Sequence, residues 1–444
     1  MAGLVHLRVL DGIAIIVMDA PPVNVLTVKL RAELWEAFQR VGSNDKIKAV
    51  VFAASGTTFS TGEDISEFDE EFEHPNLSQI CALIEDMPMP VIVAAHGQAI
   101  GGGAELMLAA HYRVVGPNTR INLPATRLGL IPSAGGTQRL PRLIGVDLTL
   151  QVLLSNSSIE PEVGRKIGLI DAIVDGDLKS GAISFANAIL GQGRGPRPTR
   201  VNRTHFVDGG AFRKRISEAR TRVRMNPEHA LNRIVDCVEA AALLPFEAGL
   251  AFEKDAFLRS VAHPQSVAFR HVFRAERSID RSLIERDGAK FFLAAPTGTM
   301  VVQRLKNAMN NAAQHIVEAG ASREDVDAAM VGYGFQRGPF GGTQTGIGGG
   351  QISRQIVAAL VAEGGVCLDQ NLVKRPADID VLAVHGIGFP CRTGGPMRAA
   401  QTDGLLGFRN DMRRWAEHSD LWAVPDVLNV AVKHAAGFDA VSDL

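Results

Sequence analysis

Residues 99–140 read AIGGGAELMLAAHYRVVGPNTRINLPATRLGLIPSAGGTQRL, and they decide the fold of the first half of the chain. The apolar residues around the glycine triplet predict a strand, a glycine turn, a helix and a second strand, which places Gly101–Gly103 at a helix entrance. Free N–H groups at such an entrance suit an anion or a developing oxyanion. Glycines there also let a strand and a helix pack tightly, so the triplet alone leaves both interpretations open. The segment holds a single acidic residue, Glu105.

Strands and helices alternate before this segment. The stretch VHLRVLDGIAIIVMDAPP from Val5 predicts two strands joined at Asp11-Gly12. A helical pattern then leads into the buried strand AVVFAAS, and ICALIEDMPMPVIVAAHG repeats the order, so we expect parallel βα units. A second small-residue turn, FSTGEDISEF at residues 59–68, also follows a predicted strand. Both turns are expected to open at one edge of the sheet, where ligand crevices form.

Patterning along the chain predicts three regions. Residues 1–190 form the α/β region, and residues 191–290 combine an Arg-rich connector with linker helices. The connector is either a solvated linker or a basic rim that attracts a phosphate-bearing ligand. Residues 291–444 are predicted to be all-α with an internal repeat. Residues 324–342 and 377–396 share an acidic helix start, an apolar helix, Gly-x-Gly-Phe and a Pro/Gly-rich exit.

Composition places the chain among ordinary globular proteins. Of its 444 residues 46% are hydrophobic and 21% are charged, with a net charge of -2, which argues against nucleic-acid binding through bulk charge. Its four cysteines show no metal-ligand spacing, so we expect free thiols, no metal and a reducing, cytoplasmic location. No run reaches the roughly 18 to 20 apolar residues of a membrane span, so we expect no membrane association.

Three motifs together resemble the crotonase (enoyl-CoA hydratase/isomerase) superfamily. They are PVIVAAHGQAIGGGAELMLAAHYRVV, FSTGEDISEF and PATRLGLIPSAGGTQRLPRLIG, and the likeness covers roughly residues 1–190. The resemblance implies an α/β spiral of ββα units that acts on a CoA thioester.

The C-terminal region resembles the duplicated helical domain of 3-hydroxyacyl-CoA dehydrogenases, in the order found in the bifunctional enzymes of fatty-acid β-oxidation. That family carries a Rossmann NAD domain before these helices. Here residues 279–300 alone occupy its place, which is too short for such a fold. The only candidate fingerprint, TGIGGGQIS from Thr345, has Gln351 at its third glycine position. We therefore predict neither NAD binding nor dehydrogenase activity.

The resemblance also implies which residues act. The backbone N–H groups of Glu63 and Gly102 would hold the thioester oxygen and stabilise enolate-like charge. Hydration further needs two carboxylates at one water. Glu105 matches the first, whereas Ala125 stands where the second is expected. The Glu63 side chain either points to solvent or takes a catalytic or substrate-tuning role, so the implied catalytic set is Glu105, Glu63 and Gly102.

The resemblance implies substrate contacts as well. Asn24 is interpreted as either a turn residue or a ligand contact. The histidines His96 and His111 are interpreted as packed structural residues. The predicted substrate-binding set is Asn24, Gly62, Asp64, Ile65, Gly101, Ala125 and Pro132.

Because one carboxylate is missing, three hypotheses stay open. The first is a hydratase or isomerase that uses Glu105 alone or recruits Glu63. The second is other acyl-CoA chemistry, such as C–C cleavage, decarboxylation or thioester hydrolysis. The third is a non-catalytic acyl-CoA-binding or scaffold subunit. Each is compatible with a homo-oligomer or a complex with another β-oxidation enzyme.

Overall fold

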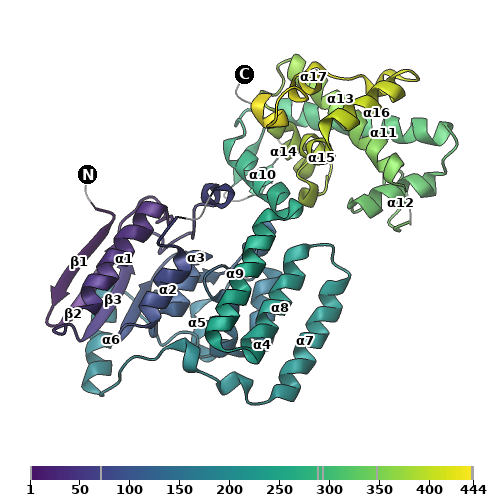
Figure 1. The fold of residues 1–444 in the computed structure, drawn as a ribbon. Coiled ribbons are helices and arrows are strands. Elements are labelled where there is room, and N and C mark those ends of the chain that lie inside the picture. The colour runs from purple at the N-terminus through teal and green to yellow at the C-terminus, as the bar shows by residue number, and fades with distance from the viewer. Residues whose placement is uncertain (1–2, 71–72, 288–289, 293–294, 347–348, 442–444) are drawn as a thin grey trace. The chain divides into compact units, whose positions relative to one another are not determined.

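The computed structural model describes most of the chain, namely residues 3–70, 73–287, 290–292, 295–346 and 349–441. The chain forms two compact units, Met1–Ala262 and His263–Leu444, which we call unit 1 and unit 2 (Figure 1). Among the described residues, no helix is long and apolar enough to cross a bilayer.

Unit 1 is built on a six-stranded sheet. Its strands lie in the order β1 (Val5–Leu10), β2 (Ile13–Met18), β3 (Ala49–Ala54), β4 (Val91–Ala95), β6 (Tyr112–Val115) and β8 (Ala172–Ile173). Strands β1 and β2 pair antiparallel, through a turn in which Asp11 and Gly12 have φ of 48° and 82°. The other neighbouring pairs are parallel, as the alternating pattern predicts. A two-stranded parallel sheet contains β5 (Gln98–Ile100) and β7 (Arg120–Asn122).

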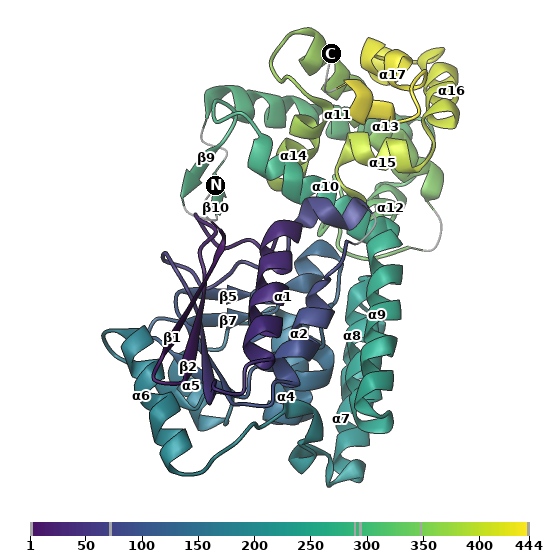
Figure 2. The same cartoon turned by 60° about the vertical axis from the view of Figure 1, so that its left-hand side comes forward.

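Helices cover both faces of the six-stranded sheet, because successive side chains of a strand point to opposite faces. In β3, Val50 and Phe52 join the large core, whereas Val51 and Ala53 join a smaller core with α6. Figure 2 shows α6 on one side of the sheet and α1 and α2 on the other. The first six helices are α1 (Val28–Gly42), α2 (Leu77–Glu85), α3 (Gly102–Ala109), α4 (Gly136–Ser155), α5 (Pro161–Lys166) and α6 (Leu178–Gly191).

Three further helices, α7 (Gly209–Arg224), α8 (His229–Leu243) and α9 (Phe246–Ala262), complete unit 1. Their buried side chains, among them Ile216, Val235 and Phe257, belong to the same core as the sheet. The expected connector region 191–290 is therefore divided at residue 262 and is not a separate region. The physical reason is that each helix carries an apolar face, and α4 offers the surface on which these faces are buried.

Some arginines of the Arg-rich stretch form ion pairs at the surface of unit 1. Arg220 of α7 donates to Asp236 and Glu239 of α8 at 2.6 and 2.5 Å. Arg197 pairs with Asp171 at 2.7 Å. A phosphate-attracting rim in this stretch stays a prediction.

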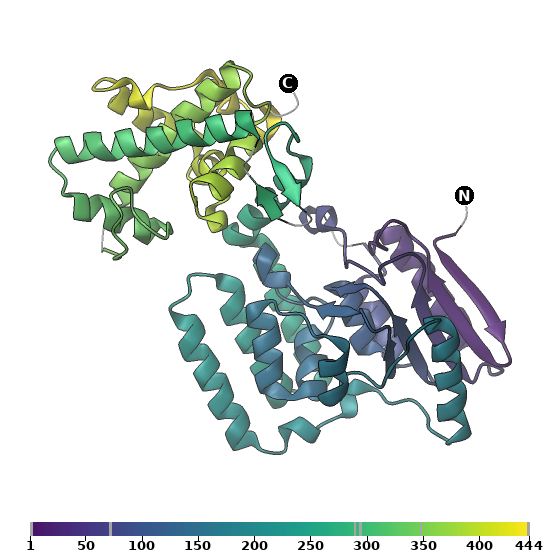
Figure 3. The same cartoon turned by 180° about the vertical axis from the view of Figure 1, so that it is seen from behind.

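Unit 2 is mostly helical (Figure 3). Its helices are α10 (Pro264–Ser278), α11 (Pro296–Glu318), α12 (Arg323–Tyr333), α13 (Gly350–Asp369), α14 (Pro376–Gly386), α15 (Pro396–Thr402), α16 (Leu405–Ala416) and α17 (Asp426–Ala431). A short antiparallel pair, β9 (Glu285–Asp287) and β10 (Lys290–Phe292), precedes α11. The region expected to be all-α thus begins with part of a strand.

The predicted internal repeat has a structural counterpart in unit 2. Asp327 of α12 accepts the N–H groups of Phe340 and Gly342, in the glycine-rich exit of the first copy, at 2.8 and 2.6 Å. Asp380 of α14 likewise accepts the N–H of Met397, directly after the second exit, at 2.8 Å. The phenylalanines of the two Gly-x-Gly-Phe motifs, Phe335 and Phe389, pack edge to face at 5.4 Å. In both copies a helix aspartate thus accepts backbone N–H groups at or next to the glycine-rich exit, and the copies contact each other through their motif phenylalanines.

Candidate active site

Two backbone turns of unit 1 lie against each other without room for side chains. The N–H of Ile100 donates to the carbonyl of Ser60 at 2.9 Å. Gly62 has φ of 89°, and a Cβ there would lie 2.9 Å from the oxygen of Ile100 and 3.1 Å from the nitrogen of Gly102. Among the described residues, the N–H groups of Glu63 and Gly102 have no hydrogen-bond acceptor. The structure therefore brings these two donors of the predicted catalytic set together.

Glu105 lies in the first turn of α3, and its side chain is buried. Its Oε1 accepts the N–H groups of Ala134 and Gly136, both at 2.8 Å, and its Oε2 accepts the N–H of Ser133 at 3.4 Å. Burial, and next the carboxylate of Glu253, raise the pKa of Glu105 to about 7 against the opposing effect of these donors. Glu105 is thus a buried acid that can exchange a proton near neutral pH.

Glu63 turns its carboxyl inward, toward Ser133. Its Oε2 accepts the hydroxyl of Ser133 at 2.9 Å. Burial, and next the carboxylate of Glu105, raise the pKa of Glu63 to about 7. Ser133 therefore bonds to both acids, and this arrangement favours a role at the site over a solvated turn for the partly buried Glu63.

The loop that contains Ser133 and Ala134 bonds to both acids, and a buried ion pair supports this loop. Arg139 of α4 donates from Nη2 to Glu85 at 2.8 Å and from Nη1 to the carbonyl of Ala134 at 2.7 Å. Both charged side chains are 1% exposed. The second oxygen of Glu85 accepts the N–H of Arg200 at 2.8 Å. These bonds fix the loop whose N–H groups face Glu105.

Asn24 serves the turn that carries it. It has φ of 51°, its Nδ2 donates to the carbonyls of Ser55 and Thr58 at 2.9 and 2.8 Å, and its Oδ1 accepts the N–H of Ala20 at 2.8 Å. This pattern favours the turn role over a side-chain ligand contact. Ligand contact through its backbone stays a prediction.

The other predicted substrate-binding residues occupy the surroundings of the two acids. Asp64 caps the 3₁₀ helix Ile65–Asp69 by accepting the N–H of Ser66 at 3.0 Å, and Ile65 begins that helix. Gly101 has φ of 53° and precedes α3. A Cβ at Gly136 would lie 2.7 Å from Pro132 and 2.9 Å from Oε1 of Glu105, which places Pro132 beside the loop.

Ala125 has no acid–base group, and the side chains of His96 and His111 bond to backbone groups. Ala125 begins the 3₁₀ helix Ala125–Leu128 and packs partly against the core. His111 is buried between the N–H of Val91 and the carbonyl of Glu85, at 3.0 and 3.1 Å, and burial lowers its pKa. The Nε2 of His96 bonds to the carbonyl of Gly56 at 3.0 Å. Both histidines match the structural interpretation.

Sequence reasoning missed Ser133 and Glu253. Ser133 belongs to the motif PSAGGTQRL, but nothing local indicates that its hydroxyl meets Glu63. Glu253 lies 118 positions from Gly135, whose N–H it accepts at 2.5 Å. The one local signal is that Glu253 falls on the same helix face as the apolar residues Phe246 and Phe257. An acid on such a face needs partners, because Asp and Glu are almost never fully buried without them.

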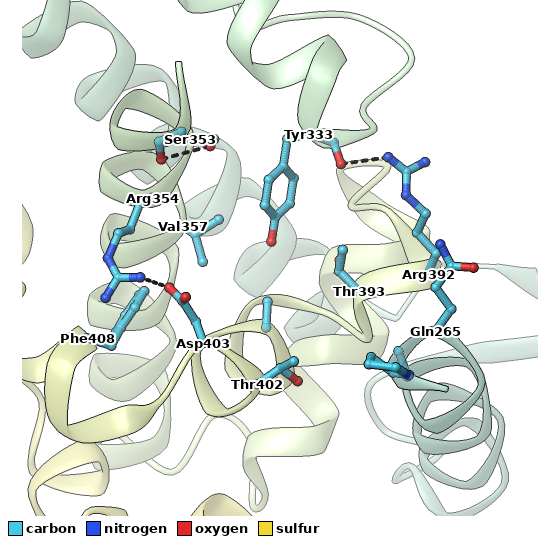
Figure 4. A pocket seen from close by; sticks show the side chains of 14 residues that line it. Gln265, Tyr333, Ser353, Arg354, Val357, Arg392, Thr393, Thr402, Asp403 and Phe408 are labelled. Atoms are coloured by element: carbon cyan, nitrogen blue, oxygen red, sulfur yellow. Dashed lines mark hydrogen bonds and ion pairs between the residues drawn. The ribbon is translucent and has the colours of Figure 1, made fainter. Parts of the chain in front are cut away.

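Unit 2 contains a cavity of about 480 Å³ (Figure 4). Arg354 closes one wall through its ion pair with Asp403, and Arg392 donates to the carbonyl of Tyr333 at 2.9 Å. The two guanidinium groups that line the cavity are thus used by the fold. Among the described residues, no group of three His, Cys, Asp or Glu is arranged to hold a metal.

The sheet of parallel βα units in unit 1 is the arrangement expected of a crotonase-type α/β fold. Residues 8–197 match the enoyl-CoA hydratase/isomerase family. Residues 300–350 match the 3-hydroxyacyl-CoA dehydrogenase C-terminal domain. The N-terminal region thus matches a crotonase-type domain and the helical C-terminal region matches part of a dehydrogenase helical domain, so the expected fold class is confirmed.

Curated relatives are multifunctional β-oxidation proteins. The chain is 33% identical over 285 residues to the peroxisomal fatty acid beta-oxidation multifunctional protein AIM1 of Arabidopsis thaliana, with 61% of this chain and 39% of that protein covered. It is 32% identical over 279 residues to the peroxisomal bifunctional enzyme of Homo sapiens, covering 62% and 38%. The chain therefore spans about two fifths of these relatives. A solved enoyl-CoA hydratase from Bacillus anthracis is 23% identical, covers 62% of this chain and 96% of its own, and has a TM-score of 0.41.

Proposed function

We propose that unit 1 is an enoyl-CoA hydratase or isomerase in which Glu63 replaces the carboxylate that Ala125 lacks. The observation that carries the proposal is the shared partner of the two acids. Ser133 donates its hydroxyl to Glu63 at 2.9 Å and its N–H to Glu105 at 3.4 Å. Two carboxyl groups with pKa raised to about 7 can supply one acid and one base near neutral pH.

The N–H groups of Glu63 and Gly102 are the proposed oxyanion donors for the thioester oxygen. Their lack of an acceptor among the described residues supports this role. Backbone donors aimed at developing charge typically contribute a few kcal/mol, about 2.7 to 4 for one donor. The glycines keep this surface open, because a side chain at Gly62 would meet the backbone beside Gly102.

The hydrogen-bond partners of the two acids support one assignment of their protonation states. Oε1 of Glu105 faces two N–H groups, which can only donate, so this oxygen stays unprotonated. Glu63 faces a hydroxyl, which can rotate and accept, so Glu63 can carry the proton. We therefore assign Glu105 as the base and Glu63 as the acid.

In the hydration step, Glu105 takes a proton from water as the water oxygen bonds to C3 of the enoyl thioester. The electron pair of the C2–C3 double bond moves onto the thioester oxygen, where the two N–H donors stabilise it. Glu63 then delivers its proton to C2. The reaction adds one water, and a proton returns from Glu105 to Glu63. Isomerisation uses the same acids to move a proton between C4 and C2.

The family match supports acyl-CoA as the substrate class. We further propose that the chain uses no NAD. The described part of unit 2 contains one two-stranded antiparallel sheet, which is not a βαβ dinucleotide fold. Residues 347–348 of the candidate fingerprint lie outside the described residues. A cytoplasmic location and assembly into a homo-oligomer or a complex with another β-oxidation enzyme stay proposals. The two curated relatives named above are described as peroxisomal.

The test is loss of the conjugated enoyl-thioester absorbance, with product masses, for short, long and aryl enoyl-CoAs. The variants are Glu105→Gln, Glu63→Gln and Ala125→Glu. Glu162→Gln on the exposed side of α5 is the matched control. We expect turnover by the wild type and the control, and losses of roughly 10²- to 10⁴-fold in Glu105→Gln and Glu63→Gln.

Full activity of Glu63→Gln would refute the replacement of the missing acid. No turnover in the wild type combined with gain in Ala125→Glu would mean that the scaffold binds substrate without this chemistry. That result would favour other acyl-CoA chemistry or a binding role.

A further inference from the structure

A further acid, Glu253 of α9, is buried and contacts the same loop as the two proposed catalytic acids. Its carboxyl is 1% exposed. Its Oε1 accepts the N–H of Gly135 at 2.5 Å, and its Oε2 accepts the N–H of Thr137 at 2.8 Å and the hydroxyl of the same threonine. The proposed reaction does not use Glu253.

Residues 133–137 form a loop that we call the acid loop. From Ala134 to Thr137 its N–H groups alternate between two carboxylates. Those of Ala134 and Gly136 point to Glu105, and those of Gly135 and Thr137 point to Glu253. Gly135 has φ of 98°, which lets successive N–H groups face opposite sides. Glu253 therefore holds one side of the strip whose other side holds Glu105.

The position of Glu253 is fixed by the packing of α9 within unit 1. Gly249 lies against Gln138, because a Cβ there would be 2.2 Å from Oε1 of that side chain. Phe246 lies under the guanidinium groups of Arg139 and Arg142 at 5.3 and 4.9 Å. An acid one helical turn from Gly249 is thus directed at the acid loop.

We propose that Glu253 is a positioning residue that orients the acid loop and acts on Glu105 through its negative charge. This inference rests on the proposed function only for its effect on turnover. The orientation of the loop and the charge on Glu105 can be measured without a substrate.

The charges around Glu253 give the direction of the effect. It faces Glu105 from α3, Arg139 from α4 and the thiol of Cys237 from α8. Burial raises the pKa of Glu253 to about 7. Burial also raises the pKa of Cys237, which keeps that thiol neutral. Because a negative Glu253 raises the pKa of Glu105, removing its charge lowers that pKa.

The test compares Glu253→Gln and Glu253→Asp with Glu247→Gln, an exposed acid on the first turn of α9. A glutamine cannot accept from both sets of donors, because its NH₂ group would face an N–H. We expect kcat to fall roughly 10- to 100-fold in Glu253→Gln, with KM little changed, because the acid loop shifts. The acidic limb of the kcat profile should move to lower pH. Glu253→Asp keeps the charge and should leave that limb in place while lowering kcat.

A second readout separates this inference from the proposed function. The carboxyl carbon of Glu105 is titrated by ¹³C NMR, with its signal assigned by loss in Glu105→Gln. Its midpoint should fall in Glu253→Gln and stay in Glu247→Gln and Glu253→Asp, whether or not the protein turns over enoyl-CoA. An unchanged Glu105 midpoint in Glu253→Gln overturns the inference. Absence of turnover in the wild type overturns only the proposed function. If Glu253→Gln does not fold, the Glu105 midpoint is compared between Glu253→Asp, which keeps the charge, and Glu253→Ala, which removes it. An equal displacement of the midpoint in both variants overturns the charge effect.

Discussion

Replacing Glu105 by Gln should stabilise unit 1 relative to wild type at alkaline pH while it lowers turnover roughly 10²- to 10⁴-fold. The folded protein holds the pKa of this carboxyl at about 7, against 4.5 as the ordinary value, mainly because of burial. The folded state therefore binds the proton more tightly than the unfolded state. This contribution to stability is fully present below the unfolded pKa and is lost as the pH rises to the folded pKa.

The magnitude follows from the shift. A difference of 7 − 4.5 = 2.5 units, at 1.36 kcal/mol per unit, corresponds to about 3 kcal/mol. Glutamine is close in shape, and its carbonyl oxygen can accept the N–H groups of Ala134 and Gly136. The stability of Glu105→Gln relative to wild type should therefore increase by about 3 kcal/mol between about pH 4 and about pH 9.

Urea unfolding across this pH range, followed by circular dichroism, measures the difference directly. Glu162→Gln, an exposed acid on α5, is the control and should give a difference that does not change with pH. A flat difference for Glu105→Gln, or one that falls as the pH rises, would refute the reasoning. Such a result would mean that the fold does not raise the pKa of this carboxyl.

Three other changes probe the support of the site. Arg139→Met should destabilise unit 1 by about 3 to 5 kcal/mol in urea unfolding, because it leaves Glu85 buried without its cation; the double variant with Glu85→Leu should recover most of this loss. Ser133→Ala should move the alkaline limb of the pH–rate profile to higher pH. In the wild type the Ser133 hydroxyl lowers the pKa of Glu63, so its removal raises that pKa; an unmoved limb contradicts the assignment of Glu63 as the acid. Gly62→Ala should lower both melting temperature and kcat, because its φ is 89° and the new Cβ would lie 2.9 Å from a backbone carbonyl of β5; a variant with normal melting and rate argues against a tightly built donor pair.

Local sequence was sufficient for much of the architecture. The hairpin at Asp11-Gly12, the buried strand β3 and the glycine turn before α3 follow from turn dihedrals and hydrophobic periodicity, which depend on neighbouring residues. The position of Glu105 in the first turn of a helix is likewise a local property, whereas its catalytic interpretation rests on the motif resemblance. The repeat in unit 2 was visible because both copies carry the same short motif.

The tertiary structure alone decided how the acids meet. The direction of Glu63 depends on Ser133, which lies 70 positions away, and the acid loop depends on Glu253, 118 positions from Gly135. The boundary of unit 1 at residue 262 depends likewise on where the apolar faces of α7 to α9 are buried. Periodicity shows that a helix has a face to bury and that a turn is open, but it carries no information on which distant surface will meet them. Sequence therefore determined the secondary-structure elements and the position of Glu105. Packing determined which acid and which loop lie beside Glu105, and how far burial raises the pKa of Glu105.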